Sequence, residues 1–204
     1  MKLVILGATG GIGLEIVQQA VELGHSVTAF VRSPERLKIF DNRINLIKGD
    51  LLNRSELESV IKGHDAVLSA FGPRAVGERA RGQFATALTK AMVHTGVRRV
   101  VAVSVAFLFK DSIVPLGFIL GRLFFGNTVP DSFEMENTII RSGLNWTIVR
   151  PPRLTDKPPT RKYRVQDGHL PSFGFKISRA DVADFMLKTI ENESTFGKII
   201  GVCD

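Results

Sequence analysis

Few residues of this sequence could build a disulfide or metal framework. The 204 residues include one cysteine, Cys203, and four histidines. A single thiol excludes an intramolecular disulfide, and the histidines do not recur at the spacing of metal ligands. We therefore predict a chain with neither a disulfide nor a metal site.

Tyrosine is equally scarce, since Tyr163 is the only one. Many enzymes that interconvert alcohols and ketones place a tyrosine and a lysine four residues apart on one helix, so that the lysine lowers the tyrosine pKa for proton exchange. Here the fourth residue after Tyr163 is Asp167. The sequence therefore disfavours alcohol–ketone chemistry by that route, and sugar-nucleotide epimerisation with it.

A long apolar run is missing from the N-terminus, where the first run covers only residues 2–6. A secretory signal needs a charged region, a longer apolar region and a cleavage site. We therefore expect a cytoplasmic protein.

Acidic residues are outnumbered, because 20 Asp and Glu face 27 Lys and Arg, which gives a formal net charge of +7. The basic residues are spread out rather than gathered in the stripe that nucleic-acid binding favours. The densest stretch is proline-rich, covers residues 150–164, and contains Asp156 as its one acidic residue. We predict no nucleic-acid partner and a small-molecule substrate, for which an anionic, aromatic molecule is the candidate.

The first thirteen residues, MKLVILGATGGIG, join a short strand to a glycine-rich turn. Residues 2–6 are typical of a buried parallel strand, because a continuous aliphatic run needs apolar cover on both faces. Glycines at every third position from Gly7 to Gly13 allow a tight turn, close approach of a phosphate and close helix–strand packing. A helical pattern over 12–22 and a strand over 26–31 complete a βαβ unit. The unit predicts a dinucleotide pyrophosphate at the helix start.

The end of the second strand indicates which dinucleotide binds. Proteins that prefer NAD place a carboxylate there for the ribose 2′-hydroxyl, whereas an arginine accommodates a 2′-phosphate. This sequence has Arg32 followed by Ser33. A guanidinium group suits phosphate geometry, so we predict a preference for NADP(H) over NAD(H).

A rhythm of helix, glycine and strand continues along the chain. A glycine follows each of four helical patterns and precedes an apolar strand: Gly24, Gly63, Gly96 and Gly143. Strands are predicted near residues 2–6, 26–31, 44–48, 65–70, 98–105, 145–150 and 198–202. No linker rich in proline, serine and glycine divides the chain. We predict a single α/β domain over residues 1–204, a doubly wound parallel sheet of the Rossmann fold, with ligands beyond the carboxyl ends of the strands.

Several stretches together resemble the atypical short-chain dehydrogenases/reductases of the NmrA-like, NAD(P)-binding family. They are GATGGIG, the arginine after the second strand, GD after the third, SGLNWTIVRPP (142–152) and ISRADVADFML (177–187). The resemblance covers nearly the whole chain. Within that family, VVAVSVAFLFKD (100–111), RSGLNW and PPRLTDKP most resemble the biliverdin-IXβ and NADPH-dependent flavin reductases.

The resemblance implies a role for residues at the strand ends. The pyrophosphate would be held by Gly7, Thr9, Gly10, Gly11, Ile12 and Gly13. The 2′-phosphate would lie against Arg32 and Ser33, and adenine against Asp50 and Leu51. The ribose and nicotinamide side would be lined by Ala70, Phe71, Gly72, Arg74, Ser104 and Pro152. Two positions depart from the reductases, because Val105 replaces a serine near the nicotinamide and Arg153 replaces a histidine.

The helix that carries the tyrosine and lysine in related dehydrogenases reads FEMEN here, at residues 133–137. What remains is hydride transfer to an acceptor that takes its proton from water, such as a flavin, a quinone or a linear tetrapyrrole. We predict that Ser104 and Arg153 position the nicotinamide or substrate, with Phe71 and Phe107 in the same wall. The alternative is a non-catalytic NADP(H)-binding redox sensor or scaffold.

Residues 113–129, IVPLGFILGRLFFGNTV, are too apolar for a free surface. They are also too short and too interrupted by proline, glycine and Arg122 to span a membrane. A lid over the substrate or a homodimer interface is favoured, and contact with a membrane surface is the alternative. We expect the elements on the substrate side to lie near residues 107–135 and 150–176.

Overall fold

The computed structural model of the chain describes residues 1–35, 37, 42–72, 80–109 and 128–204. Its strands are β1 (Lys2–Leu6), β2 (Ser26–Val31), β3 (Asn45–Lys48), β4 (Ala66–Ser69), β5 (Arg99–Val103), β6 (Asn145–Arg150), β7 (Arg153–Thr155), β8 (Arg164–Asp167), β9 (Lys176–Ser178) and β10 (Lys198–Cys203). Its helices are α1 (Gly11–Glu22), α2 (Arg54–Ile61), α3 (Arg81–Thr95), α5 (Thr128–Ile140) and α6 (Arg179–Lys188), with short 3-10 turns η2 (Ala106–Leu108) and η3 (Glu193–Thr195).

The main sheet has eight strands in the order β3-β2-β1-β4-β5-β6-β10-β8. Every neighbouring pair is parallel except β10 and β8, which pair antiparallel. The chain winds outward from β1 through β2 to β3, then returns to β4 on the other side of β1. This order confirms the predicted doubly wound α/β domain, and it places the topological switch point between β1 and β4.

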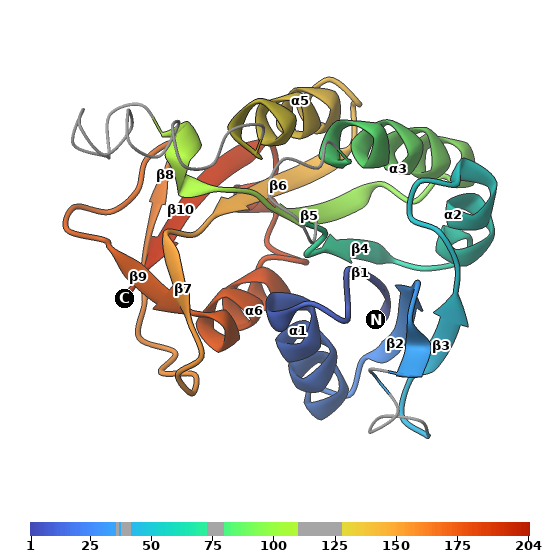
Figure 1. Ribbon diagram of the computed structural model, residues 1–204, viewed down its shortest axis with the longest axis horizontal. Coiled ribbons are helices and arrows are strands. Elements are labelled where there is room, and N and C mark those ends of the chain that lie inside the picture. Colours follow the sequence, from blue (N-terminus) through green and yellow to red (C-terminus); the bar gives the residue numbers. More distant parts are fainter. Residues whose placement is uncertain (36, 38–41, 73–79, 110–127) are drawn as a thin grey trace.

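Helices cover both faces of the sheet (Figure 1). α1 and α6 pack together below the sheet in that view, whereas α2, α3 and α5 lie side by side above it. Each layer encloses its own apolar cluster. Ile16, Val17 and Met186 belong to the first, and Phe84, Leu88 and Met92 to the second. The burial of both sheet faces explains why β1, β4 and β5 read as continuous aliphatic runs.

The seven predicted strands are all present, with ends that differ from the prediction by at most two residues. Each of the four glycines predicted to end a helix has a positive φ, between 70° and 80°. The prediction missed β7 and β9, which form a separate two-stranded parallel sheet, and the edge strand β8. These strands are three or four residues long, and their pairing joins segments far apart in the sequence.

Residues 113–127 of the predicted apolar segment 113–129 lie outside the described residues. Residues 128 and 129 begin α5, which includes the FEMEN stretch at residues 133–137. No helix among the described residues is long and apolar enough to cross a membrane.

Candidate functional site

A pocket opens at the carboxyl ends of the central strands, across the switch point. Its walls come from the ends of β1, β2 and β4 and from the turn after β3. The lining residues are Gly7, Thr9, Gly10, Phe30, Val31, Arg32, Leu51, Ala70, Phe71 and Gly72. Eight of them were predicted from the sequence as cofactor ligands, so the structure brings half of the sixteen predicted cofactor residues together in one pocket.

The glycine turn is built from backbone atoms that leave no room for side chains. A Cβ on Gly7 would lie 2.8 Å from backbone atoms of Ala70 and Phe71, and the φ of Gly7 is +75°. A Cβ on Gly13 would lie 2.1 Å from the carbonyl oxygen of Gly7. Strand β4, the turn and α1 therefore approach one another more closely than any other residue would permit.

The start of α1 carries amide groups that no side chain caps. Gly10 is the N-cap and offers no side-chain acceptor, and the first turn of α1 contains no acidic residue. Such a helix start attracts an anion through its N–H groups and its dipole. This cradle fits a pyrophosphate. Ile12 packs into the apolar cluster beneath, so its side chain takes no part in the pocket.

Gly11 does not line the pocket, because the side chain of Arg179 lies against it. A Cβ on Gly11 would lie 2.5 Å from Arg179 Cδ. Arg179 is held in place by Asp156, with Nη1 2.5 Å from Oδ1. A guanidinium from α6 therefore reaches the N-terminus of α1, a contact that sequence reasoning did not foresee.

Of the four residues predicted to contact the 2′-phosphate and adenine, two line the pocket and two do not. Arg32 is exposed and lines the pocket, whereas Ser33 follows it without lining the pocket. Leu51 is buried and forms part of the wall. Asp50 points into its own turn, because its Oδ1 accepts from Leu52 N at 3.0 Å.

On the β4 side, Ala70, Phe71 and Gly72 line the pocket as expected. Ser104 follows β5, and its buried Oγ has no hydrogen-bond partner among the residues that the structure describes. Pro152 and Arg153 lie beyond the walls of the pocket, and Arg153 is exposed on β7. Phe107 is half-buried in η2 and also lies outside these walls. Arg74 lies outside the described residues.

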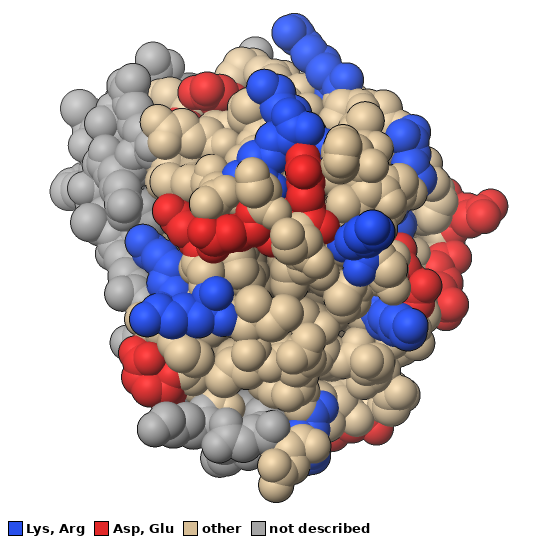
Figure 2. Space-filling model, turned by 90° about the vertical axis from the view of Figure 1, so that its right-hand side faces the viewer, with Lys and Arg blue, Asp and Glu red and all other residues tan. Residues whose placement is uncertain are grey.

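The two arginines at the ends of the basic stretch 150–164 are engaged by other parts of the protein. Arg150 is buried and holds Glu136 of α5 through two nitrogens, with Nε 2.9 Å from Oε1. Arg164 donates to the carbonyl oxygens of Ser172 and Asp204. Figure 2 shows a different face, the one with α2 and β3, where Lys and Arg are interspersed with Asp and Glu. No continuous basic stripe is visible on that face.

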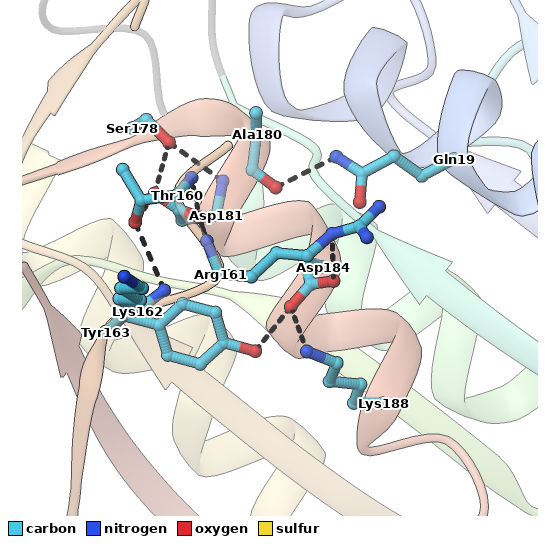
Figure 3. A network of polar contacts seen from close by, with 10 residues as sticks. All are labelled: Gln19, Thr160, Arg161, Lys162, Tyr163, Ser178, Ala180, Asp181, Asp184 and Lys188. Carbon is cyan, nitrogen blue, oxygen red and sulfur yellow. Dashed lines mark hydrogen bonds and ion pairs between the residues drawn. The ribbon is translucent and has the colours of Figure 1, made fainter. Parts of the chain in front are cut away.

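Tyr163 belongs to a polar network on α6 and not to the pocket (Figure 3). Its hydroxyl donates to Asp184 Oδ2 at 2.6 Å, and Lys188 pairs with the same oxygen. Burial and this hydrogen bond raise the pKa of Tyr163, whereas a tyrosine that acts as a catalytic acid needs a lowered pKa. Nearby, Asp181 accepts from the amides of Thr160 and Arg161.

Two wall residues were missed at the sequence level, namely Phe30 and Val31. Both belong to β2, which was predicted as a strand without a ligand role for either residue, and Phe30 is also part of the apolar core. Phe30 fills both roles because Gly49 leaves space for its ring, since a Cβ there would lie 2.2 Å from Phe30 Cε2. Among the described residues, no group of three or more histidine, cysteine, aspartate or glutamate side chains could hold a metal ion.

Comparison with known proteins gives a family for this pocket. The model of the NAD(P)H-binding family matches residues 7–193. An uncharacterized chloroplastic protein of Arabidopsis thaliana is 29% identical over 220 residues, covering 98% of this chain and 76% of that protein. An isoflavone reductase homologue of Zea mays is 35% identical over 89 residues, covering 39% of this chain and 29% of that protein.

Solved structures share the whole fold. A short-chain dehydrogenase/reductase of Veillonella parvula in complex with NADP superposes with a TM-score of 0.87 at 23% identity, covering 100% of this chain and 94% of that one. An anaerobillin reductase of Escherichia coli O157:H7 gives a TM-score of 0.84 at 18% identity, covering 100% and 97%. The family match spans the glycine turn, the pocket and α6, and the chain belongs to the NAD(P)H-binding family with a Rossmann fold.

Proposed function

We propose that this protein is an NADPH-dependent reductase that transfers hydride to a conjugated acceptor of the flavin, quinone or linear tetrapyrrole type. The observation that carries the proposal is the pocket at the switch point, whose glycine cradle fits a pyrophosphate and whose β2 end presents Arg32. Relatives and structural neighbours named as reductases support the same class of chemistry.

Arg32 supports NADPH as the preferred cofactor. It is exposed in the wall at the end of β2, where NAD-dependent proteins place a carboxylate. Neither Asp nor Glu occurs among the lining residues of the described part of the chain. A 2′-phosphate would gain a charge-assisted contact at Arg32, whereas a 2′-hydroxyl would not. A structural neighbour solved with NADP is consistent with this preference.

The kind of acceptor follows from the residues that could donate a proton. Tyr163 is committed to Asp184, and its raised pKa makes it a poor acid for a substrate oxygen. A bound nicotinamide supplies the hydride, and conjugated acceptors can take the accompanying proton from water. The pocket residues then act by orientation, with Phe71 and the backbone of Gly72 fixing one side of the cleft.

The test is to mix the purified protein with NADPH and a panel of flavin mononucleotide, riboflavin, quinones and a linear tetrapyrrole, and to follow the nicotinamide absorbance. We expect turnover with at least one of these acceptors, and slower turnover when NADH replaces NADPH. Tight NADPH binding without turnover across the panel would reject the reductase and favour a redox sensor or scaffold. A wild-type protein that binds neither NADPH nor NADH would reject both.

A further inference from the structure

Arg81 is a half-buried cation at the start of α3 that has no carboxylate partner among the described residues. The nearest candidate is Asp131 of α5, but its carboxylate accepts from the backbone amides of Ala80, Arg81 and Gly82 at 3.3, 3.0 and 3.1 Å. Asp131 therefore caps α3, and none of the described Asp or Glu side chains forms an ion pair with the Arg81 guanidinium. Burial lowers the pKa of Arg81, which Asp131 opposes.

One edge of the guanidinium is free of partners within the described chain. Arg81 Nη1 donates to Ser132 Oγ at 2.8 Å, whereas the buried Nε has no partner. The Nε–Nη2 edge is the one through which Arg150 holds the carboxylate of Glu136. Two parallel N–H groups in this arrangement match the oxygens of a carboxylate or a phosphate.

The free edge lies beside the pocket wall. Arg81 Nη2 is 3.2 Å from the position that a Cβ on Gly72 would occupy, and Gly72 lines the pocket. Arg32 lies at the β2 end of the same pocket, on the other side of β1 from β4. A cofactor whose 2′-phosphate meets Arg32 therefore directs its nicotinamide half, and the acceptor next to it, toward the β4 end where Arg81 lies.

We propose that Arg81 is the anion-binding residue at the β4 end of the pocket and that it holds a phosphate or carboxylate through its Nε–Nη2 edge. This proposal rests on the pocket being the dinucleotide site. Two sources could supply the anion, which are the phosphate on the nicotinamide side of the cofactor and an anionic group on the acceptor. The first arm of the experiment tests the cofactor and the second tests the acceptor.

In the first arm, calorimetry measures the affinities of wild type and Arg81→Gln for NADPH and for adenosine 2′,5′-bisphosphate, which lacks the nicotinamide half. If the cofactor supplies the anion, the variant should bind NADPH about tenfold more weakly, the scale of one lost charge-assisted contact. Affinity for the bisphosphate should not change. An equal loss for both ligands would indicate a disturbed pocket and would overturn the proposal.

In the second arm, quenching of flavin fluorescence measures binding of flavin mononucleotide and riboflavin to protein saturated with NADP⁺. If the acceptor supplies the anion, Arg81→Gln should weaken binding of the mononucleotide about tenfold and leave riboflavin unchanged. Arg153→Gln is compared in the same assay, because Arg153 was predicted from the sequence to position the nicotinamide or substrate. A loss confined to Arg153→Gln would exclude the acceptor as the source of the anion at Arg81, and together with an unchanged first arm it would overturn the proposal.

Two variants separate the charge of Arg81 from its packing. Arg81→Lys keeps the charge without the fork and should bind with an affinity between those of wild type and Arg81→Gln. Arg141→Gln removes an exposed arginine outside the pocket and should match wild type. If the wild type binds NADPH but Arg81→Gln changes neither the affinity for NADPH nor that for flavin mononucleotide, the proposal for Arg81 is wrong while the proposed function stands. If the wild type binds no NADPH, the proposed function fails first.

Discussion

The glycine turn after β1 and the basic stretch 150–164 are both conspicuous in the sequence. They differ in whether their hydrogen-bond donors find partners elsewhere in the protein. The turn leaves the amides at the start of α1 without side-chain partners and surrounds them with a pocket. In the basic stretch, by contrast, Arg150, Arg161 and Arg164 are engaged by Glu136, by Asp184 and by backbone carbonyls. Donors left unpaired inside a pocket therefore identify a candidate ligand site more directly than density of charge does.

The largest effect should come from breaking the buried pair in the basic stretch. Glu136→Ala leaves the Arg150 guanidinium buried and without its carboxylate, so we expect the free energy of unfolding to fall by about 3–5 kcal/mol. Chemical denaturation measures this change. The double variant Glu136→Met with Arg150→Met should recover much of the loss, and a double variant as unstable as the single one would contradict this account.

The next effect concerns the glycine turn itself. In Gly13→Ala the new methyl group would meet the carbonyl oxygen of Gly7, so the turn must shift, and we expect NADPH affinity to fall about 100-fold. Calorimetry provides the affinity. The matched control is Gly63→Ala, which strains a backbone of positive φ in open space away from the pocket. This control should lose stability while binding NADPH normally.

A smaller effect should separate the two cofactors. Arg32→Ala should weaken NADPH binding about tenfold and leave NADH binding nearly unchanged, because only NADPH carries the 2′-phosphate. Lys48→Ala removes the same charge from an exposed position at the end of β3 and should change the affinity for neither cofactor. Equal losses for NADPH and NADH in Arg32→Ala would refute the assignment of this residue to the 2′-phosphate.

The smallest effect should come from the exposed end of the basic stretch. Asp156 pairs with Arg179 but is 89% exposed, so Asp156→Ala should change the free energy of unfolding by no more than about 1 kcal/mol. Asp181, which is buried and accepts from Thr160 and Arg161, should cost more than about 2 kcal/mol when changed to alanine. Thermal unfolding would rank the two variants, and the reverse order would count against the comparison.

The sequence predicted the central fold well because its signals there are local. The aliphatic runs, the glycine spacing and the helix between them identify β1, α1 and β2, and the pocket includes eight of the predicted ligands. Arg32 could be found for the same reason, since its place at the end of β2 follows from the strand alone.

What the sequence did not reveal depends on contacts between distant segments. Arg150 belonged to the basic stretch that was predicted to favour an anionic small molecule, whereas in the structure it is buried against Glu136 of another element. Arg179 reaches Gly11 only because α6 packs on α1. Likewise, nothing local indicates that Asp131 would occupy the amides of α3 and leave Arg81 without an acidic partner in the described part of the chain.

The capping of α3 by Asp131 also affects how fast the amides at the start of that helix exchange their hydrogens with solvent. The amides of Ala80, Arg81 and Gly82 bond to a carboxylate that belongs to another helix, so they exchange with solvent only when α5 separates from the start of α3. The hydrogen-exchange rates of these three amides therefore report how often α5 separates from the start of α3. A ligand that contacts Gly72 and Arg81 should slow the exchange of these amides, whereas a ligand confined to the β2 end of the pocket should leave their exchange rates unchanged.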